Sequence, residues 1–163
     1  MTTTIALRTA TSTDVPAIAA LVNTAFAVER AFVDRDRTNV DEIAGMMQKG
    51  TFFVVDDEAD GLLAAMYLER RQPGHAYLGM LSIQPSKQGR GLGRAMMAAA
   101  EAQVRAWGDT ALDIRILSLR TELPPFYRAL GFVETGLTSV VADPLSRKPY
   151  RFILMSKGLG AGD

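Results

Sequence analysis

The sequence contains no cysteine. This absence excludes disulfides, thiolate zinc sites and a cysteine nucleophile belonging to the protein itself. Histidine is nearly absent as well, with His75 as the single example. No pattern of metal ligands is visible along the chain, so we expect no metal site.

An excess of either charge is also missing, because 18 basic residues balance 18 acidic ones. A protein that binds nucleic acid non-specifically needs a basic excess to neutralise phosphates. No apolar run approaches the ~18 residues that a membrane span requires, and the N-terminus shows no signal-peptide pattern. We therefore expect a cytoplasmic protein that binds neither nucleic acid nor a membrane.

The 163 residues, with 48% hydrophobic and 22% charged residues, are typical of one globular domain. We expect a single domain over residues 1–158 and a loose tail over 159–163. Strand and helix signals alternate, which predicts an α/β or α+β domain. Expected strands cover 5–8, 51–55, 62–68, 75–83, 112–117, 132–141 and 150–156. Expected helices cover 12–27, 39–48, 91–107 and 124–130.

Two helix features carry more specific predictions. The second helix should end at Gly50 as its C-terminal cap. The long helix should bury the face formed by Leu92, Ala95, Met96, Ala99, Ala102 and Ala106.

A glycine loop, Gln88-Gly89-Arg90-Gly91-Leu92-Gly93-Arg94, lies between an apolar strand and an alanine-rich helix. The first turn of a helix has unpaired N–H groups and a partial positive charge, so it favours anions. Glycines allow a phosphate to approach those amides, and Arg90 and Arg94 add positive charge. The segment therefore predicts a phosphate site.

Spacing excludes two common glycine motifs. A dinucleotide fingerprint starting at Gly89 would need glycine where Arg94 stands, and a Walker loop would need a G-K-[ST] sequence that is absent. A glycine-rich connection with solvated arginines remains the alternative for the loop taken alone.

The chain resembles the GNAT superfamily of acetyl-CoA-dependent N-acetyltransferases. Gln88, Gly91 and Gly93 match its Q/R-x-x-G-x-G/A motif, and the segment Pro125-Phe126-Tyr127-Arg128-Ala129-Leu130-Gly131-Phe132 is similar to its second signature. The strand at 78–85 and both ends of the chain also look like the family.

The resemblance implies a mixed, bent sheet of about six or seven strands with about four helices, splayed at the fourth and fifth strands. Acetyl-CoA would lie in the splay, with its pantetheine arm along the fourth strand and its pyrophosphate on the glycine loop. The implied cofactor-binding residues are Leu81, Ser82, Ile83, Gln88, Gly89, Arg90, Gly91, Leu92, Gly93 and Arg94.

The implied activity is direct transfer of an acetyl group to a primary amine of a small molecule or peptide. Tyr127 would protonate the departing thiolate; the alternative for this residue is a tyrosine that packs on the sheet. A catalytically degenerate acetyl-CoA sensor or interaction module is the competing function. The expected partners are acetyl-CoA and the amine acceptor, with a homodimer left open.

The sequence departs from the family at two positions. Arg120 stands where many members have an asparagine, and Tyr77 stands where protein-lysine members often have a glutamate. Glu69 and His75 are the candidates for a general base acting through water, although a residue in either position is more often an ordinary surface residue. An α-amine, which titrates at about 7.7 to 8.0, needs little help from a base.

The acceptor cleft is expected at the segment between the first two helices. Phe26 and Glu29 lie in this segment, and Tyr77 is the third candidate for substrate binding. Glu29 would attract a cationic amine, or it is a solvated charge.

Overall fold

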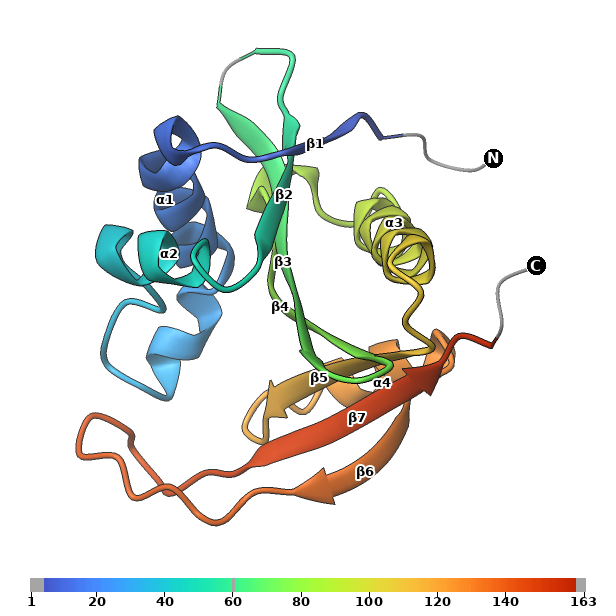
Figure 1. Ribbon diagram of the computed structural model, residues 1–163. Coiled ribbons are helices and arrows are strands. Elements are labelled where there is room, and N and C mark those ends of the chain that lie inside the picture. Colours follow the sequence, from blue (N-terminus) through green and yellow to red (C-terminus); the bar gives the residue numbers. More distant parts are fainter. Residues whose placement is uncertain (1–4, 60, 161–163) are drawn as a thin grey trace.

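The computed structural model describes residues 5–59 and 61–160, which form seven strands and four α-helices (Figure 1). The strands are β1 (Leu7–Thr9), β2 (Thr51–Asp56), β3 (Leu62–Gln72), β4 (His75–Ile83), β5 (Ala111–Leu117), β6 (Val133–Leu137) and β7 (Phe152–Gly158). The α-helices are α1 (Val15–Ala25), α2 (Val40–Met46), α3 (Leu92–Ala106) and α4 (Leu123–Ala129). Short 3₁₀ turns are η1 (Ser12–Asp14), η2 (Ala27–Ala31) and η3 (Pro85–Lys87).

The strands form one mixed sheet in the order β1-β2-β3-β4-β5-β7-β6. Strands β4 and β5 run parallel, whereas the other neighbours are antiparallel. In Figure 1 the sheet bends between β4 and β5, so that β5, β7 and β6 form a lower layer beneath the others. The predicted mixed, bent sheet is confirmed.

The splay predicted between the fourth and fifth strands is present. Strand β4 pairs with β5 only over residues 75–77, opposite 111–113. Beyond this point Met80 adopts a positive φ of 55°, and the β3–β4 register shifts between Ala65 and Tyr67. A β-bulge of this kind bends a strand and interrupts its pairing. The end of β4 therefore leaves the edge facing β5 open.

Helices cover both faces of the upper sheet, with α1 and α2 on one side and α3 on the other (Figure 1). Both faces need a cover because they are apolar: the side chains of β2 alternate between two cores, one on each face of the sheet. Phe52 and Val54 pack with the α1–α2 side, whereas Phe53 and Val55 pack with the α3 side. Within the described residues, no helix is both long enough and apolar enough to cross a membrane.

The predicted buried face of α3 is partly wrong. Leu92 and Met96 are buried as expected, but Ala102 and Ala106 are exposed. The helix instead buries Leu92, Met96, Met97, Ala100, Glu101 and Val104. Alanine is small enough for either face of a helix, so the bulkier side chains determine which face of α3 is buried.

Gly50 does not cap α2, because the helix ends at Met46 and Met47 is the C-cap residue. A Cβ atom on Gly50 would lie 2.5 Å from the Tyr67 hydroxyl and 2.6 Å from the Leu68 carbonyl oxygen. Glycine is therefore required by the close approach of β3 and not by a left-handed cap.

Leu159 also departs from the prediction, which placed it in a loose tail. Its side chain is buried, and its N–H donates to the Thr110 carbonyl at 2.8 Å. This hydrogen bond fixes the chain one residue beyond β7. Residues 161–163 of the predicted tail lie outside the described residues.

Candidate functional site

A cavity of about 570 Å³ lies at the splay between β4 and β5. Its walls come from β4, the glycine loop, the start of α3, β5, α4 and the segment after α1. It brings together most of the residues that the sequence singles out. These are Phe26, Glu29, Tyr77, Leu81, Ile83, Gln88, Gly89, Gly91, Leu92, Gly93, Arg94 and Tyr127.

The glycine loop forms one end of the cavity and leads into α3. Gly89 and Gly91 both have φ of 80°, and Gly91 is the N-cap residue of the helix. Only glycine adopts this left-handed conformation without strain, and the loop can thereby turn directly into the helix. The first-turn amides of α3 lie beside the cavity, where they can bind an anion. Arg94 lines the cavity, whereas Arg90 does not.

The end of β4 forms the wall beside the loop. Leu81 and Ile83 line the cavity. Ser82 is buried outside the cavity lining and donates its hydroxyl to the Met80 carbonyl at 3.0 Å. Gln88 ties the loop to this strand, because its side-chain amide donates to the Ile83 carbonyl at 3.3 Å.

Tyr127 lies on α4 with its side chain buried beside the cavity. Its ring meets Phe126 and Phe132 edge-on, with centroid distances of 5.1 Å and 5.7 Å. Burial raises the pKa of its phenol to about 12, although the positive charge of Arg120 acts in the opposite direction. Tyr127 is therefore protonated at neutral pH and can donate a proton.

Glu29 is joined to Arg120 across the cavity wall. Its Oε2 accepts from Arg120 Nη1 at 2.7 Å, and the two side chains are only 17% and 12% exposed. Arg120 Nε also donates to Glu122 at 3.1 Å. Glu29 is the only carboxylate among the lining residues of this cavity, within the part of the chain that the structure describes. Its charge is thus already balanced by a neighbour.

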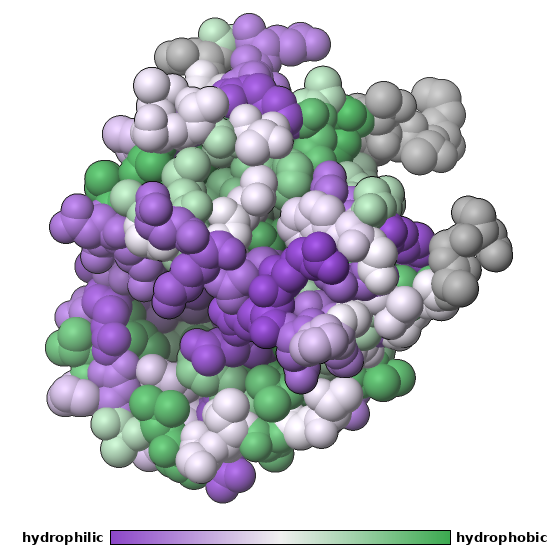
Figure 2. Space-filling model, viewed as in Figure 1, coloured by the Kyte–Doolittle hydropathy of each residue, from purple (hydrophilic) through white to green (hydrophobic). Residues whose placement is uncertain are grey.

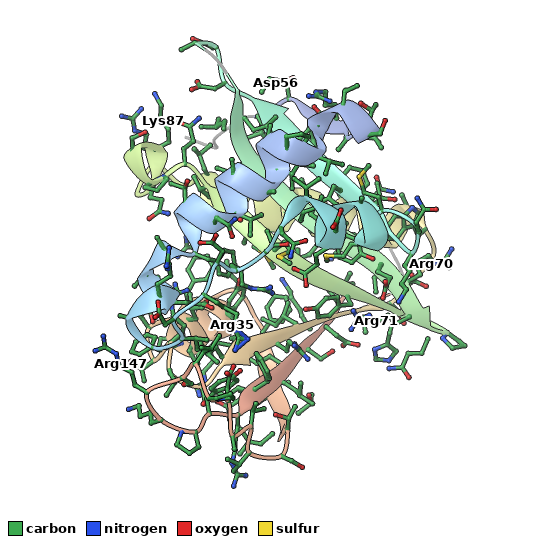
Figure 3. The ribbon with its side chains drawn as sticks, turned by 90° about the vertical axis from the view of Figure 1, so that its left-hand side faces the viewer. Arg35, Asp56, Arg70, Arg71, Lys87 and Arg147 are labelled. Carbon is green, nitrogen blue, oxygen red and sulfur yellow. The ribbon has the colours of Figure 1, made fainter. Side chains whose placement is uncertain are left out.

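Glu69 lies outside the cavity, near the end of the β3–β4 hairpin. It accepts hydrogen bonds from the Tyr67 hydroxyl at 2.6 Å and from Arg71. Burial alone would raise the pKa of the Glu69 carboxyl, but these two donors hold it below its ordinary value. Figure 2 shows hydrophilic residues gathered over this hairpin, and Figure 3 places Arg70 and Arg71 at its end, away from Arg35.

His75 is likewise outside the cavity. Its Nδ1 lies 2.9 Å from Asp113 Oδ2, and Ser156 donates its hydroxyl to the other oxygen of Asp113 at 2.6 Å. These three residues link β4, β5 and β7 where the strands still pair. The structure therefore does not bring Glu69 or His75 to the cavity that holds Tyr127.

Several lining residues were not among the predicted site residues, including Arg115 and Phe152, together with Phe126 of the second signature and Arg37 at the end of the expected cleft segment. Arg115 interrupts the apolar residues of β5, and this alternation is a signal that could have marked it. Arg37 stands in an irregular segment with no periodicity to read. Within residues 5–59 and 61–160, no group of three acidic, histidine or cysteine side chains is placed to hold a metal ion.

Comparison with solved structures shows the same fold in known acetyltransferases. The ribosomal-protein-S18-alanine N-acetyltransferase of Escherichia coli has a TM-score of 0.80 and 17% identity, with 98% of this chain and 97% of that chain covered. The phosphinothricin acetyltransferase of Sinorhizobium meliloti, solved with acetyl-CoA, has a TM-score of 0.75 and 20% identity, with 98% and 91% covered.

A ribosomal-protein-alanine N-acetyltransferase from Brucella melitensis has a TM-score of 0.74 and 20% identity, with 94% of this chain and 99% of that chain covered. A search of curated proteins gave no significant match. The family model described as an acetyltransferase (GNAT) domain matches residues 17–154. That match takes in the glycine loop, the open end of β4 and Tyr127, and the chain is therefore a member of the GNAT acetyltransferase family.

Proposed function

We propose that this protein transfers the acetyl group of acetyl-CoA directly to a primary amine of a small molecule or peptide. One observation carries the proposal: a single cavity extends from the glycine loop to Tyr127 along the unpaired end of β4. An anion site, an open strand edge and a buried proton donor are the features that such a reaction needs.

The residues present fit acetyl-CoA. The amides at the start of α3 suit a pyrophosphate, and Arg94 adds a positive charge at the same end. The open edge of β4 near Leu81 and Ile83 suits an extended chain with amide groups, which can bind as an added strand. The solved Sinorhizobium meliloti neighbour contains acetyl-CoA.

Acetyl-CoA supplies an activated thioester when it is bound. The amine nitrogen forms a bond to the acetyl carbon while the carbon–sulfur bond breaks, and the sulfur leaves with the electron pair. Tyr127 donates its phenolic proton to that sulfur, and the proton that the amine loses returns to the Tyr127 phenolate through solvent. A phenol with a pKa of about 12 stays neutral near pH 7 and can therefore donate a hydrogen bond to the sulfur as charge builds there.

The site supports an acceptor that arrives as the free base. Glu29 is paired with Arg120, and neither Glu69 nor His75 lines the cavity. An α-amine, with a pKa of about 7.7 to 8.0, is far more often unprotonated at neutral pH than a lysine at about 10.4. This difference favours α-amines over lysine side chains.

The test combines acetyl-CoA with a panel of amines and follows free thiol release together with the mass of the acetylated product. We expect turnover with at least one class of α-amine. The names of the solved neighbours include both ribosomal-protein alanine and phosphinothricin acetyltransferases, so the panel includes peptides and small molecules. Tight acetyl-CoA binding without turnover of any amine would favour a sensor and contradict the proposal.

A further inference from the structure

The cavity continues into a second, smaller one of about 170 Å³. The two meet at Phe26 and Glu29, the predicted acceptor residues, and this region is called the acceptor end. The two cavities share lining residues, among them Phe26, Glu29, Arg37, Arg115 and Phe152. Pockets for drug-sized ligands usually have about 300 to 1,000 Å³, so this extension suits only a small chemical group. Its lining residues come from the segment after α1, from β5 and from the start of β7, and not from the glycine loop.

Arg115 supplies an unneutralised positive charge to both cavities. Its guanidinium carbon lies 4.0 Å from the centre of the Phe152 ring. The β5–β7 register explains this contact, because Phe152 pairs with Leu117 and is therefore a diagonal neighbour of Arg115. Among the described residues, no carboxylate lies within ion-pair distance of Arg115. Stacking on a ring fixes a guanidinium plane while its N–H edge stays available.

Arg37, in the segment between α1 and α2, also lies over an aromatic ring. Its guanidinium carbon lies 5.5 Å from the centre of the Phe26 ring. Its ion-pair contact is with Glu42, at 3.9 Å, and the same carboxylate oxygen accepts the Thr38 hydroxyl at 2.5 Å. An exposed pair at this distance contributes little, so most of the charge of Arg37 remains available.

The acidic residues that line the two cavities already have partners. Glu29 is bound by Arg120, and Asp36 accepts from Arg30 at 3.2 Å. Arg35 lines the smaller cavity as well, but it is paired with Asp143. Figure 3 shows Arg35 between the segment after α1 and the lower layer of the sheet. Among the described arginines that line this end, Arg35 and Arg120 are therefore engaged by short ion pairs, whereas the guanidinium edges of Arg37 and Arg115 are not.

We infer that the acceptor is a small amine that also carries a carboxylate, which Arg37 and Arg115 bind together. A guanidinium edge binds a carboxylate with two parallel hydrogen bonds, and two aromatic rings hold the two edges at the cavity. The amine of the same molecule would then extend toward Tyr127. This inference rests on the proposed acetyl transfer and names the class of acceptor for that site.

The test compares acid–amide pairs, in which an amino acid and its amide differ only in whether the carboxylate is present. Both α-carboxylates and side-chain carboxylates are sampled, and kcat/KM is expressed per free-amine form because the two members have different amine pKa values. We expect the acids to be better acceptors. Arg115→Gln should lower kcat/KM for the acids by about 10- to 150-fold, as loss of hydrogen bonds to a charged group does, and change the amides less than about 3-fold.

Arg147→Gln is the matched control, because this exposed arginine lies outside both cavities and points away from the molecule in Figure 3. It should leave both members of each pair unchanged. Arg115→Lys keeps the charge but not the paired donors, and it should recover only part of the selectivity.

Equal loss for acids and amides in Arg115→Gln would show a structural role and overturn the inference while acetyl transfer stands. Turnover restricted to peptides with an acidic residue would show that the acceptor is not a small molecule. Acetyl-CoA binding without turnover of any acceptor would instead remove the proposed function, and this inference with it.

Discussion

Arg120 donates a 2.7 Å hydrogen bond to Glu29, although the two residues are 91 positions apart in the sequence. Arg120 precedes α4 and Glu29 belongs to η2, so the pair joins the lower and upper layers at the cavity wall. Both side chains are largely buried. Removing either partner leaves a charge with less compensation in a poorly solvated place.

A double-mutant cycle measures this link. Glu29→Gln and Arg120→Gln should each lower the free energy of unfolding, because each leaves one charged partner behind. The coupling between them should be on the order of 0.5 to 3 kcal/mol, as found for residues in direct contact. Urea unfolding of the two single variants and the double variant gives the value. A coupling below about 0.3 kcal/mol would mean that the pair is not formed in solution.

Binding of acetyl-CoA at the glycine loop can be tested through Gly93. A Cβ atom there would lie 3.6 Å from the Phe126 ring, which is an ordinary contact, and the backbone is not left-handed. Gly93→Ala should therefore fold normally but place a methyl group at the cofactor site. Acetyl-CoA at 100 times its dissociation constant should stabilise the parent by about 2.7 kcal/mol, and the variant clearly less at the same concentration.

Gly45→Ala is the control for that experiment, because a Cβ atom there meets nothing within 4 Å. This variant lies in α2, away from the cavity, and should keep the full stabilisation by acetyl-CoA. Thermal unfolding with and without acetyl-CoA is the measurement. If Gly93→Ala retains the full gain, the cofactor does not contact the start of α3.

Tyr127→Phe removes the hydroxyl and keeps the ring contacts with Phe126 and Phe132. The loss of a general acid costs about 10² to 10⁴ in rate, or roughly 2.7 to 5.4 kcal/mol. We expect this loss in kcat, with little change in the affinity for acetyl-CoA or in stability. A thioester with a more acidic thiol should narrow the difference in kcat between Tyr127→Phe and the parent. Parent-like turnover when chemistry is rate-limiting would reduce Tyr127 to a packing residue.

The rise of activity with pH should follow the amine of the acceptor and not a base on the enzyme. Glu29 is engaged by Arg120, so kcat/KM should rise with pH until the amine of the acceptor is fully deprotonated. Acceptors with different amine pKa values should therefore show correspondingly displaced profiles. At the alkaline end, activity should fall as the Tyr127 phenol, with a pKa near 12, loses its proton. A profile that stays fixed for all acceptors would reveal a base on the protein.

Acid stability should depend on Asp14, which accepts two hydrogen bonds from Arg8 at 2.9 Å. These bonds lower the pKa of its carboxyl to about 2, against about 3.9 in an unfolded chain. Because the folded pKa is depressed, the stabilisation is complete above about pH 4 and is lost as the pH falls through 2.

Asp14→Asn should accordingly reduce stability by about 1 kcal/mol at neutral pH, since Arg8 is partly solvated. The difference from the parent should disappear near pH 2. Glu58→Gln, an exposed change in the β2–β3 turn, should have little effect at either pH. Chemical unfolding at several pH values makes the comparison. A difference that persists at pH 2 would assign the effect to something other than the charge of Asp14.

Features that depend only on neighbouring residues could be predicted from the sequence. Strand β4 was predicted over 75–83, as observed, because its apolar run ends in turn residues on both sides. The glycine loop predicted a helix start beside an anion site, because backbone conformation and helix-end amides are local properties. The resemblance to the GNAT family then implied the splay and marked Tyr127, which the structure places at the cavity.

The side chains that line the acceptor end of the cavity could not be predicted in this way, because they come from segments far apart in the chain. Glu69 and His75 could not be excluded from the sequence, and the structure places both outside the cavity with partners of their own. The pairing of Glu29 with Arg120 and the stacking of Arg115 on Phe152 join residues that are distant along the chain. Such contacts depend on how the two layers of the sheet pack, and no local periodicity encodes that packing.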